Sequence, residues 1–253
     1  MKRRIKTDEP MTDQEGLDLD HDKQRSITLI DQIIRQRKTT KLFLSVTQRA
    51  RAEQAWTERH RSELATVIEG AAWAPFHRRA QQNINANGDL QSALPWRFYV
   101  LEGKSCTALL SLIEQQAKLN PDSKWSRAWQ SRIRDMVSGC GALIQATWLP
   151  DLEEGSIEPE LTIGNMEHIA AASAAIQNVL LAAEARDWLS YWSSGGILRD
   201  PDLFEMMGIP HTEVLLGSLF LTPTAVAETR QISGGLRDER GEVREWVRWI
   251  DFS

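Results

Sequence analysis

A run of small residues over 170–185 is the sequence feature that most constrains how this chain folds. The run is dominated by alanine and carries Gln177 and Asn178 in its middle. We expect one helix from Asn165, as N-cap, to Arg186, roughly 33 Å long at the α-helical rise. Because small side chains lie on several of its faces, other elements can approach this helix closely from more than one side. Two arrangements stay open: a central helix packed against a partner chain, or a helix buried within one subunit.

The composition is that of a soluble globular protein, with 42% hydrophobic and 26% charged residues among 253. That length allows a sizeable core in one large domain or two small ones. A net charge of −5 argues against a general nucleic-acid or membrane-surface binder, which is normally basic. The first residues lack the apolar run of a signal peptide, and no window approaches the roughly 18 apolar residues of a membrane span. The sequence therefore predicts a cytoplasmic protein.

Cysteine and histidine give no sign of a metal site or a disulfide framework. Cys106 and Cys140 are far apart and belong to no CxxC pattern, and the five histidines lack paired spacing. The chain also lacks a Walker phosphate loop, a dinucleotide-binding glycine pattern after a strand and a GxSxG elbow. We therefore assign no catalytic side chain and no metal ligand. If the protein is an enzyme, a bound organic cofactor is expected to supply the reactive atoms.

The remaining periodicities predict alternating helices and strands between two polar ends. Residues 1–25 are polar and aperiodic, which indicates a flexible arm, and residues 26–230 form the predicted domain. Residues 231–253 form an extension whose apolar residues, among them Trp246 and Trp249, need burial, for which a partner subunit is one candidate. The predicted helices are 26–38, 58–73, 104–118, a stretch through Trp125 and Trp129 to Met136, and 201–207 between Asp200 and Gly208; the predicted strands are 96–101, 142–148, 189–192 and 213–222.

Residues 37–43 combine three cations and two hydroxyls directly after a helical repeat. Arg37 offers a planar fork of donors, Lys38 and Lys41 offer point charges, and Thr39 offers a short hydroxyl, so the segment suits a phosphate group. The alternative is a solvated helix end, because basic residues in a last turn are favoured by the helix dipole alone.

Five segments in order along the chain resemble the flavin-dependent nitroreductase family. Members of that family carry an Arg-Arg-Ser-x-Arg-x-Phe type motif, then Ala-Pro-Ser, Gln-Pro-Trp-x-Phe, an alanine-rich helix with a Gln-Asn pair, and a Trp-x-Ser-Gly loop. The matching segments here are 37–43, 74–77, 95–98, 174–185 and 192–195. The resemblance covers about residues 27–230 and is greatest to the branch with compact subunits. It implies an α+β fold with three α-β-α layers around a central, mostly antiparallel sheet, in a homodimer that binds FMN at the subunit interface.

The resemblance also implies a set of flavin-binding residues. Arg37, Lys41 and Arg230 would hold the FMN phosphate, and Thr39 would hydrogen-bond to it. Lys38 would lie along the ribityl chain or the ring edge. The ring would be contacted by two further groups: Pro75, Phe76 and His77 from one subunit, and Ser193, Ser194 and Gly195 at the ring edge.

Two departures from the family pattern remove polar groups expected near the ring. Leu94 stands where the family usually has Gln, and Phe76 stands where Ser is usual. The spacer between Pro75 and Pro95 is also longer than is typical of the family. Its polar loop over 78–94 carries Arg78, Arg79, Gln81, Gln82 and Asn83, and is predicted to cover the flavin and to select substrates.

The predicted function is an FMN-dependent oxidoreductase that takes hydride from NAD(P)H and reduces a nitroaromatic or quinone by a ping-pong mechanism. Two alternatives stay open. One is a flavin enzyme of the same fold that performs dehalogenation, heterocycle oxidation or flavin breakdown. The other is a flavin-binding sensor or interaction protein without turnover.

Overall fold

The computed structural model describes residues 13–43, 55–80, 90, 92–130, 132–153, 158–226 and 230–251. The chain divides into two compact units, of which the first ends at Arg37 and the second begins at Lys38. Among the described residues, no helix is both long enough and apolar enough to cross a membrane.

The first unit is built on helix α1 (Asp13–Gln36). The sequence predicts a helix over 26–38 only, so its predicted start is wrong. Residues 13–25 lack an apolar repeat, but the Glu, Gln, Leu, Lys and Arg among them have enough intrinsic helix propensity to extend a helix that has already formed. Ile27, Ile30 and Ile34 of α1 are exposed.

A four-stranded antiparallel sheet forms the centre of the second unit, in the order β2-β3-β5-β4. Two further strands, β1 and β6, pair with each other, and Thr39 forms a parallel bridge to Ser190 of β4. The four strands predicted from the apolar segments are confirmed as β2 (Trp96–Glu102), β3 (Ala142–Trp148), β4 (Trp188–Ser193) and β5 (Val214–Pro223). The short strands β1 (Thr40–Phe43) and β6 (Arg230–Ser233) were not predicted.

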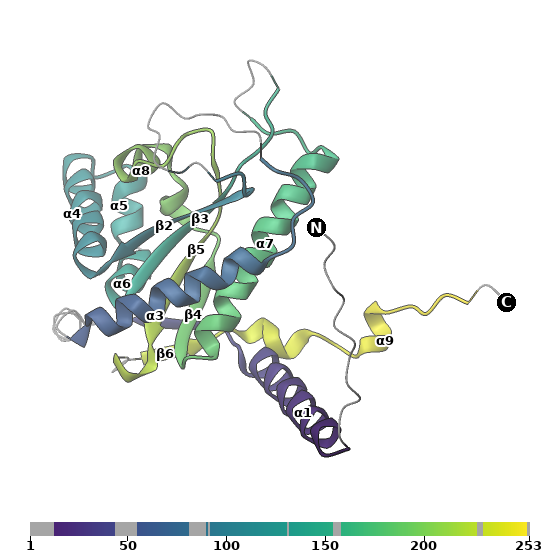
Figure 1. Ribbon diagram of the computed structural model, residues 1–253. Coiled ribbons are helices and arrows are strands. Elements are labelled where there is room, and N and C mark those ends of the chain that lie inside the picture. The colour runs from purple at the N-terminus through teal and green to yellow at the C-terminus, as the bar shows by residue number, and fades with distance from the viewer. Residues whose placement is uncertain are drawn as a thin grey trace, which may run out of the picture. The chain divides into compact units, whose positions relative to one another are not determined.

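Helices cover both faces of this sheet and produce three layers (Figure 1). Four helices lie over one face, whereas α3 and α7 lie over the other. The predicted α+β fold with α-β-α layers is therefore confirmed. The helices of the first face are α4 (Gly103–Leu119), α5 (Lys124–Trp129), α6 (Arg132–Gly139) and α8 (Pro201–Met207); those of the second are α3 (Glu58–Glu69), which continues into the 3-10 turn η1 (Gly70–Trp73), and α7 (Ile163–Glu184). The 3-10 helices η2 (Gly196–Arg199), η3 (Thr224–Val226) and η4 (Gly235–Glu239) and the short helix α9 (Val243–Trp246) lie in the connections and in the C-terminal segment.

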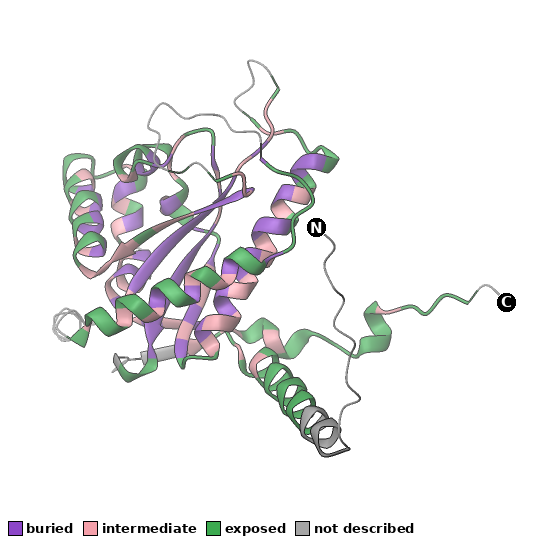
Figure 2. Ribbon diagram, in the orientation of Figure 1, coloured by how far each residue is buried: buried purple, intermediate pink, exposed green. Residues whose placement is uncertain are grey.

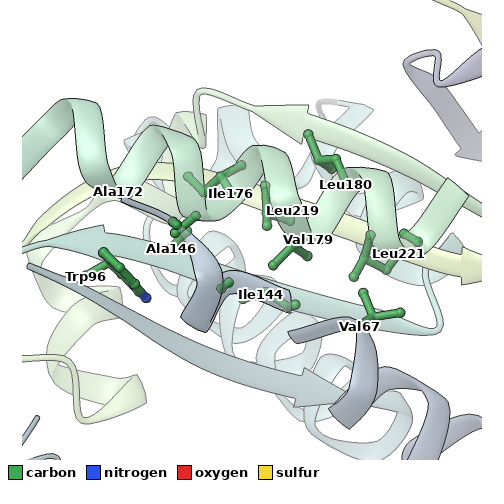
Figure 3. Close-up of a cluster of buried hydrophobic side chains, with 14 of the residues drawn as sticks. Val67, Trp96, Ile144, Ala146, Ala172, Ile176, Val179, Leu180, Leu219 and Leu221 are labelled. Carbon is green, nitrogen blue, oxygen red and sulfur yellow. The ribbon is translucent and has the colours of Figure 1, made fainter. Parts of the chain in front are cut away.

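The larger hydrophobic core lies between the sheet and α7 (Figures 2 and 3). Ala172, Ile176 and Val179 of α7 meet Ile144 of β3 and Leu219 of β5 there. Alanine and valine on this face keep the helix close to the strands, as the small-residue run predicts. Burial of these side chains is the main favourable term for the unit, at about 25 cal/mol for each Å² of apolar surface removed from water.

The start of α7 differs from the prediction. Thr162, not Asn165, is the N-cap, and its hydroxyl accepts a hydrogen bond from the Asn165 amide at 3.1 Å. The buried Asn165 side chain instead accepts from the Asp151 amide at 2.8 Å and donates to the carbonyls of Asp151 at 3.1 Å and Glu160 at 2.8 Å. Asn165 therefore ties the first turn of α7 to the connection after β3.

Short helix α8 has the ends that the sequence predicts. The Asp200 side chain accepts a hydrogen bond from the Asp202 amide at 3.1 Å, Pro201 is the first helical residue, and Gly208 follows the last turn with φ of +68°. A residue with a Cβ is strained at that φ, so glycine is favoured there.

Candidate functional site

The phosphate-type segment lies at the β4 edge of the sheet. Thr39 bridges Ser190, and the carbonyl of Thr39 accepts a hydrogen bond from the Gly234 amide at 3.0 Å. The strand that follows, β1, then packs against the end of α6, where the backbone of Leu42 lies next to Gly139. The segment is thus held from both sides by backbone contacts.

Lys41 projects from this segment over an aromatic ring. Its Nζ lies 4.8 Å from the centre of the Tyr191 ring, and Tyr191 in turn stacks on Phe220 with ring centres 5.7 Å apart. No carboxylate of the described residues lies within ion-pair distance of Lys41 Nζ. The charge of Lys41 is therefore not neutralised by this part of the chain.

The other two predicted phosphate ligands, Arg37 and Arg230, and the predicted ribityl contact Lys38 occupy different settings. Arg37 follows α1 at the end of the first unit, its amide donates to the Ile33 carbonyl at 2.9 Å, and its side chain is half-buried. Lys38 is exposed at the start of the second unit. The backbone of Arg230 pairs with Phe43, two residues along from the partner of Lys41.

The predicted ring-edge loop closes the other end of β4. Ser193 is buried, and its hydroxyl accepts a hydrogen bond from the Gly195 amide at 3.2 Å. The carbonyl of the exposed Ser194 accepts from Arg199 Nε at 3.0 Å. Gly195 has φ of +100°, and a Cβ there would lie 2.6 Å from Leu215 Cδ2. Only glycine fits this turn without strain.

Pro75, Phe76 and His77 lie at the opposite edge of the sheet. All three are exposed, and the Phe76 ring meets Trp96 at the start of β2 edge-to-face, with centres 5.9 Å apart. Next to them, at the end of η1, the Trp73 side chain is 83% exposed. This edge thus offers exposed aromatic surface, and the exposed Arg78 and Arg79 follow it directly along the chain.

The two predicted halves of the site do not meet within one chain. Strand β2 carries Trp96 and strand β4 carries Ser193, and β3 and β5 lie between these strands. Three strand spacings separate the two edges, which is roughly 14 Å. A ring bound at the Ser193–Gly195 loop would have to span the width of the sheet to touch Phe76 of the same subunit.

The segment before β2 is held by an arginine that the sequence reasoning missed. Arg97 is buried, and its guanidinium donates to the carbonyls of Leu94 at 2.7 Å, Trp96 at 2.8 Å and Ser92 at 2.5 Å. Leu94, which replaces the family glutamine, packs against the larger core. The lost amide is thus replaced by an apolar contact within the subunit.

A buried carboxylate on the same side of the molecule was also missed. The Tyr99 hydroxyl donates to Glu213 Oε1 at 2.8 Å, and the Thr147 hydroxyl donates to Oε2 of the same carboxylate. Burial raises the pKa of Glu213 above its usual value, although the two hydrogen bonds and the nearby charge of Arg97 oppose that rise. Through these two hydrogen bonds Glu213 links β2 and β3 to the start of β5, so its role is structural support of the sheet.

Part of the predicted substrate loop falls within the described residues. Arg78 is exposed and its Nε lies 2.9 Å from Glu167 Oε2 on α7, and Arg79 is exposed. Gln81, Gln82 and Asn83 lie outside the described residues. The described residues contain no group of histidine, cysteine and acidic side chains arranged to hold a metal ion.

Sequence and structure comparisons place the chain in a known family. The model of the Nitroreductase family matches residues 60–221, which is well over half of the chain. The chain therefore belongs to the nitroreductase family. The matched region includes Pro75 to His77 and Ser193 to Gly195, whereas the 37–43 segment and Arg230 lie outside it.

Solved structures agree on the fold at low sequence identity. A nitroreductase-like family protein from Bacillus cereus is 17% identical, with a TM-score of 0.51 over 85% of this chain and 95% of its own. A variant of the FMN- and NADPH-dependent nitroreductase NfnB from Sphigopyxis sp. strain HMH is 13% identical, with a TM-score of 0.53 over 88% and 99%. No curated protein matches the chain in sequence.

Proposed function

We propose that this protein is an FMN-dependent oxidoreductase that takes hydride from NAD(P)H and reduces an electron-poor small molecule such as a nitroaromatic or a quinone. Membership of the nitroreductase family supports an oxidoreductase activity. The observation that carries the cofactor assignment is the Lys38–Lys41 segment, whose cations and hydroxyls border the same strand that ends in the Ser193–Gly195 turn. Cofactor and reductant agree with those named for the structurally similar NfnB.

The donor set suits a flavin mononucleotide. Lys41 presents a charge without a carboxylate partner among the described residues, Thr39 adds a hydroxyl, and Arg37 and Arg230 are assigned to the same phosphate from the resemblance. The distance along β4 from Ser190 to Ser193 is roughly 10 Å. A phosphate at one end and a ring at the other would therefore lie along this strand, with Lys38 beside the linker between them.

The bound flavin would supply the atom that accepts and returns hydride, and the side chains would bind and orient it. Ser193, Ser194 and Gly195 would offer donors at the ring edge, where preorganised dipoles stabilise developing negative charge. Pro75, Phe76 and His77 would cover the ring from a second subunit and exclude water. The 78–94 loop is assigned to substrate selection on the strength of its length and polarity.

Apolar surface left exposed on one chain supports the homodimer. On α7 and before it, Leu161 is 77% exposed and Ile163 is 67% exposed, and Met166 is also exposed. Trp246 and Trp249 of the C-terminal segment are exposed as well, and we assign them to the partner subunit. Exposed apolar side chains of this size are candidates for burial against another subunit. A second copy would bring its aromatic edge to the β4 edge of the first, and the reverse, which solves the separation of the two half-sites.

The test is the visible spectrum of the purified full-length protein, followed by anaerobic mixing with NADH or NADPH. A yellow protein whose extracted chromophore is FMN, and whose absorbance bleaches rapidly, supports the reductase. Reoxidation by a quinone or nitroaromatic would complete the cycle. A yellow protein that neither nicotinamide bleaches supports a sensor, and a protein that takes up no FMN contradicts both.

Turnover with a different acceptor would favour the second enzymatic alternative. The replacement of two polar residues by Phe76 and Leu94 motivates it, because the ring contacts differ from those of the family pattern. Steady-state assays with halogenated, heterocyclic and flavin substrates, at equal concentration of loaded protein, separate this alternative from nitroaromatic or quinone reduction.

A further inference from the structure

The contact between Lys41 and Tyr191 is the least expected feature of the candidate phosphate site. A surface lysine ordinarily points into solvent or pairs with a carboxylate. Here Nζ lies 4.8 Å from the centre of the Tyr191 ring, and no described carboxylate lies within ion-pair distance. The ammonium is therefore placed by an uncharged group.

The ring that holds Lys41 is itself fixed. Tyr191 lies in the centre of β4 and stacks on Phe220 of β5 at an interplanar angle of 21°. Both rings border a cavity of about 10 Å³ that Lys41 and Thr40 also line. That volume is close to the smallest that holds one water molecule.

An aromatic face and a carboxylate hold an ammonium group with different consequences. A carboxylate would neutralise Lys41 and would have to be displaced before an anion could bind. The ring face attracts the cation through its quadrupole and leaves the full positive charge available, and it also reduces the rotamer freedom that a four-carbon side chain loses on binding. Preorganisation of this kind raises affinity by lowering the cost of ordering the ligand contacts.

We infer that Tyr191 is a positioning residue for the phosphate group of the cofactor, acting through Lys41. Tyr191 makes no contact with the phosphate itself in this scheme. It holds the Lys41 ammonium over its ring face before the ligand arrives. The inference rests on the proposed FMN function and adds to it a residue that the sequence motif does not contain.

The test is a double-mutant cycle read by binding and not by turnover. The dissociation constants of FMN and riboflavin are measured by flavin fluorescence for the wild type, Tyr191→Met, Lys41→Met and the double variant. Tyr191→Met is expected to weaken FMN binding about twofold to fivefold, the size of an exposed cation–π contact. It should leave riboflavin, which lacks the phosphate, unchanged, and should add nothing in the Lys41→Met background.

Controls separate positioning from folding and from failure of the proposed function. Tyr191→Phe keeps the ring face and should bind FMN like the wild type. Equal losses for FMN and riboflavin, or an equal loss with and without Lys41, would overturn the inference while the flavin function stands. If the wild type itself binds no FMN, the proposed function fails first, and the inference falls with it.

A second measurement needs no destabilising variant. In the free wild-type protein with labelled lysine, the ε-methylene protons of Lys41 should be shifted upfield by the ring current of Tyr191, with Lys41→Arg used to assign the signal. Tyr191→Phe should keep the shift. A Lys41 signal at the position of solvent-exposed lysines would contradict the inference whether or not Tyr191→Met folds.

Discussion

The two edges of the central sheet differ in chemistry. The β4 edge carries Thr39 and Lys41 on a segment held by backbone contacts, and it ends in the Gly195 turn, which only glycine adopts without strain. The β2 edge carries exposed Phe76 against Trp96, backed by buried Arg97. In the proposed function, the β4 edge would hold the phosphate and the β2 edge would place exposed Phe76 against the flavin ring.

Neither edge is a complete flavin site, and roughly 14 Å of sheet separates them. In the proposed flavin site, a single chain would carry both half-sites at opposite edges of its sheet. A flavin site shared between two subunits would link the family resemblance, the exposed apolar side chains of α7 and the cationic segment. In such a site, the cofactor is bound where the β4 edge of one subunit meets the β2 edge of the other.

The largest expected effect is at the anion edge. Arg37→Ala combined with Lys41→Ala should weaken FMN binding by a factor of a hundred or more, because each charge-assisted contact contributes roughly 1.5–3 kcal/mol. Equilibrium dialysis with FMN and riboflavin measures the loss, which should be much smaller for riboflavin. Lys104→Ala combined with Lys118→Ala, two exposed cations of α4, is the matched control and should bind FMN normally. Unchanged FMN occupancy in the first variant would remove the phosphate assignment.

The next largest effect concerns dimerisation, which in the proposed function brings the two sheet edges together. Ala170 is exposed on α7, and Ala170→Arg should place a charge in the proposed subunit contact, at a cost of about 3–5 kcal/mol in dimerisation free energy if the charge stays unpaired. Sedimentation velocity should show a monomer that is folded but flavin-free. Ala108→Arg, on exposed α4 over the opposite face of the sheet, is the control and should remain a flavin-bound dimer. A dimer that persists in Ala170→Arg places the interface elsewhere.

A smaller effect concerns the support of α7. Asn165→Ala removes three buried hydrogen bonds to Asp151 and Glu160, and should lower the free energy of unfolding by about 2–3 kcal/mol. Urea denaturation followed by circular dichroism measures it. Thr162→Ala, which removes the N-cap hydroxyl, is expected to cost only about 1 kcal/mol. A smaller loss for Asn165→Ala than for Thr162→Ala would contradict the role of the Asn165 side chain in holding α7 to the connection after β3.

The smallest effect is pH-dependent and lies at the β2 edge. Burial raises the folded-state pKa of Glu213. The stabilisation that Glu213 adds to the free energy of unfolding is therefore fully present below its usual pKa of 4.5, and it is lost as pH rises through the folded-state pKa. Glu213→Gln keeps hydrogen-bonding atoms for Tyr99 and Thr147 but does not titrate. The variant should therefore lack the fall in the free energy of unfolding with rising pH. The free energies of unfolding of the wild type and the variant, measured from pH 4 to pH 8, should therefore be similar at low pH. They should diverge at higher pH, where the variant should be the more stable. Parallel curves would show that Glu213 titrates normally.

The sequence predicted the elements better than the contacts between them. Helices and strands follow from local apolar periodicity, which is why the long α7 and the apolar β5 were correctly predicted. Asn165 was misassigned because a polar residue near a helix start can cap the helix or reach outside it, and only the fold decides. Glu213 was missed because its partners Tyr99 and Thr147 lie 114 and 66 residues away in the chain.

The candidate site shows the same limit. The cationic segment was visible in the sequence because its residues are consecutive. Its neighbour Tyr191 was not, because a strand contact joins positions 150 residues apart in the chain. The placement of the 74–77 segment at the opposite edge also depends on strand order, which no local pattern encodes.

Complementation between two defective chains tests the central claim most directly. Phe76→Glu should disable the ring-covering half-site, and Arg37→Ala with Lys41→Ala should disable the anion half-site, so neither homodimer should bind FMN tightly. Mixed by unfolding and refolding together, the two variants should form heterodimers that contain one intact site. The account predicts recovery of tight FMN binding at up to one flavin per heterodimer. No recovery in heterodimers confirmed by native mass spectrometry would show that both half-sites act within a single subunit, and would contradict the account.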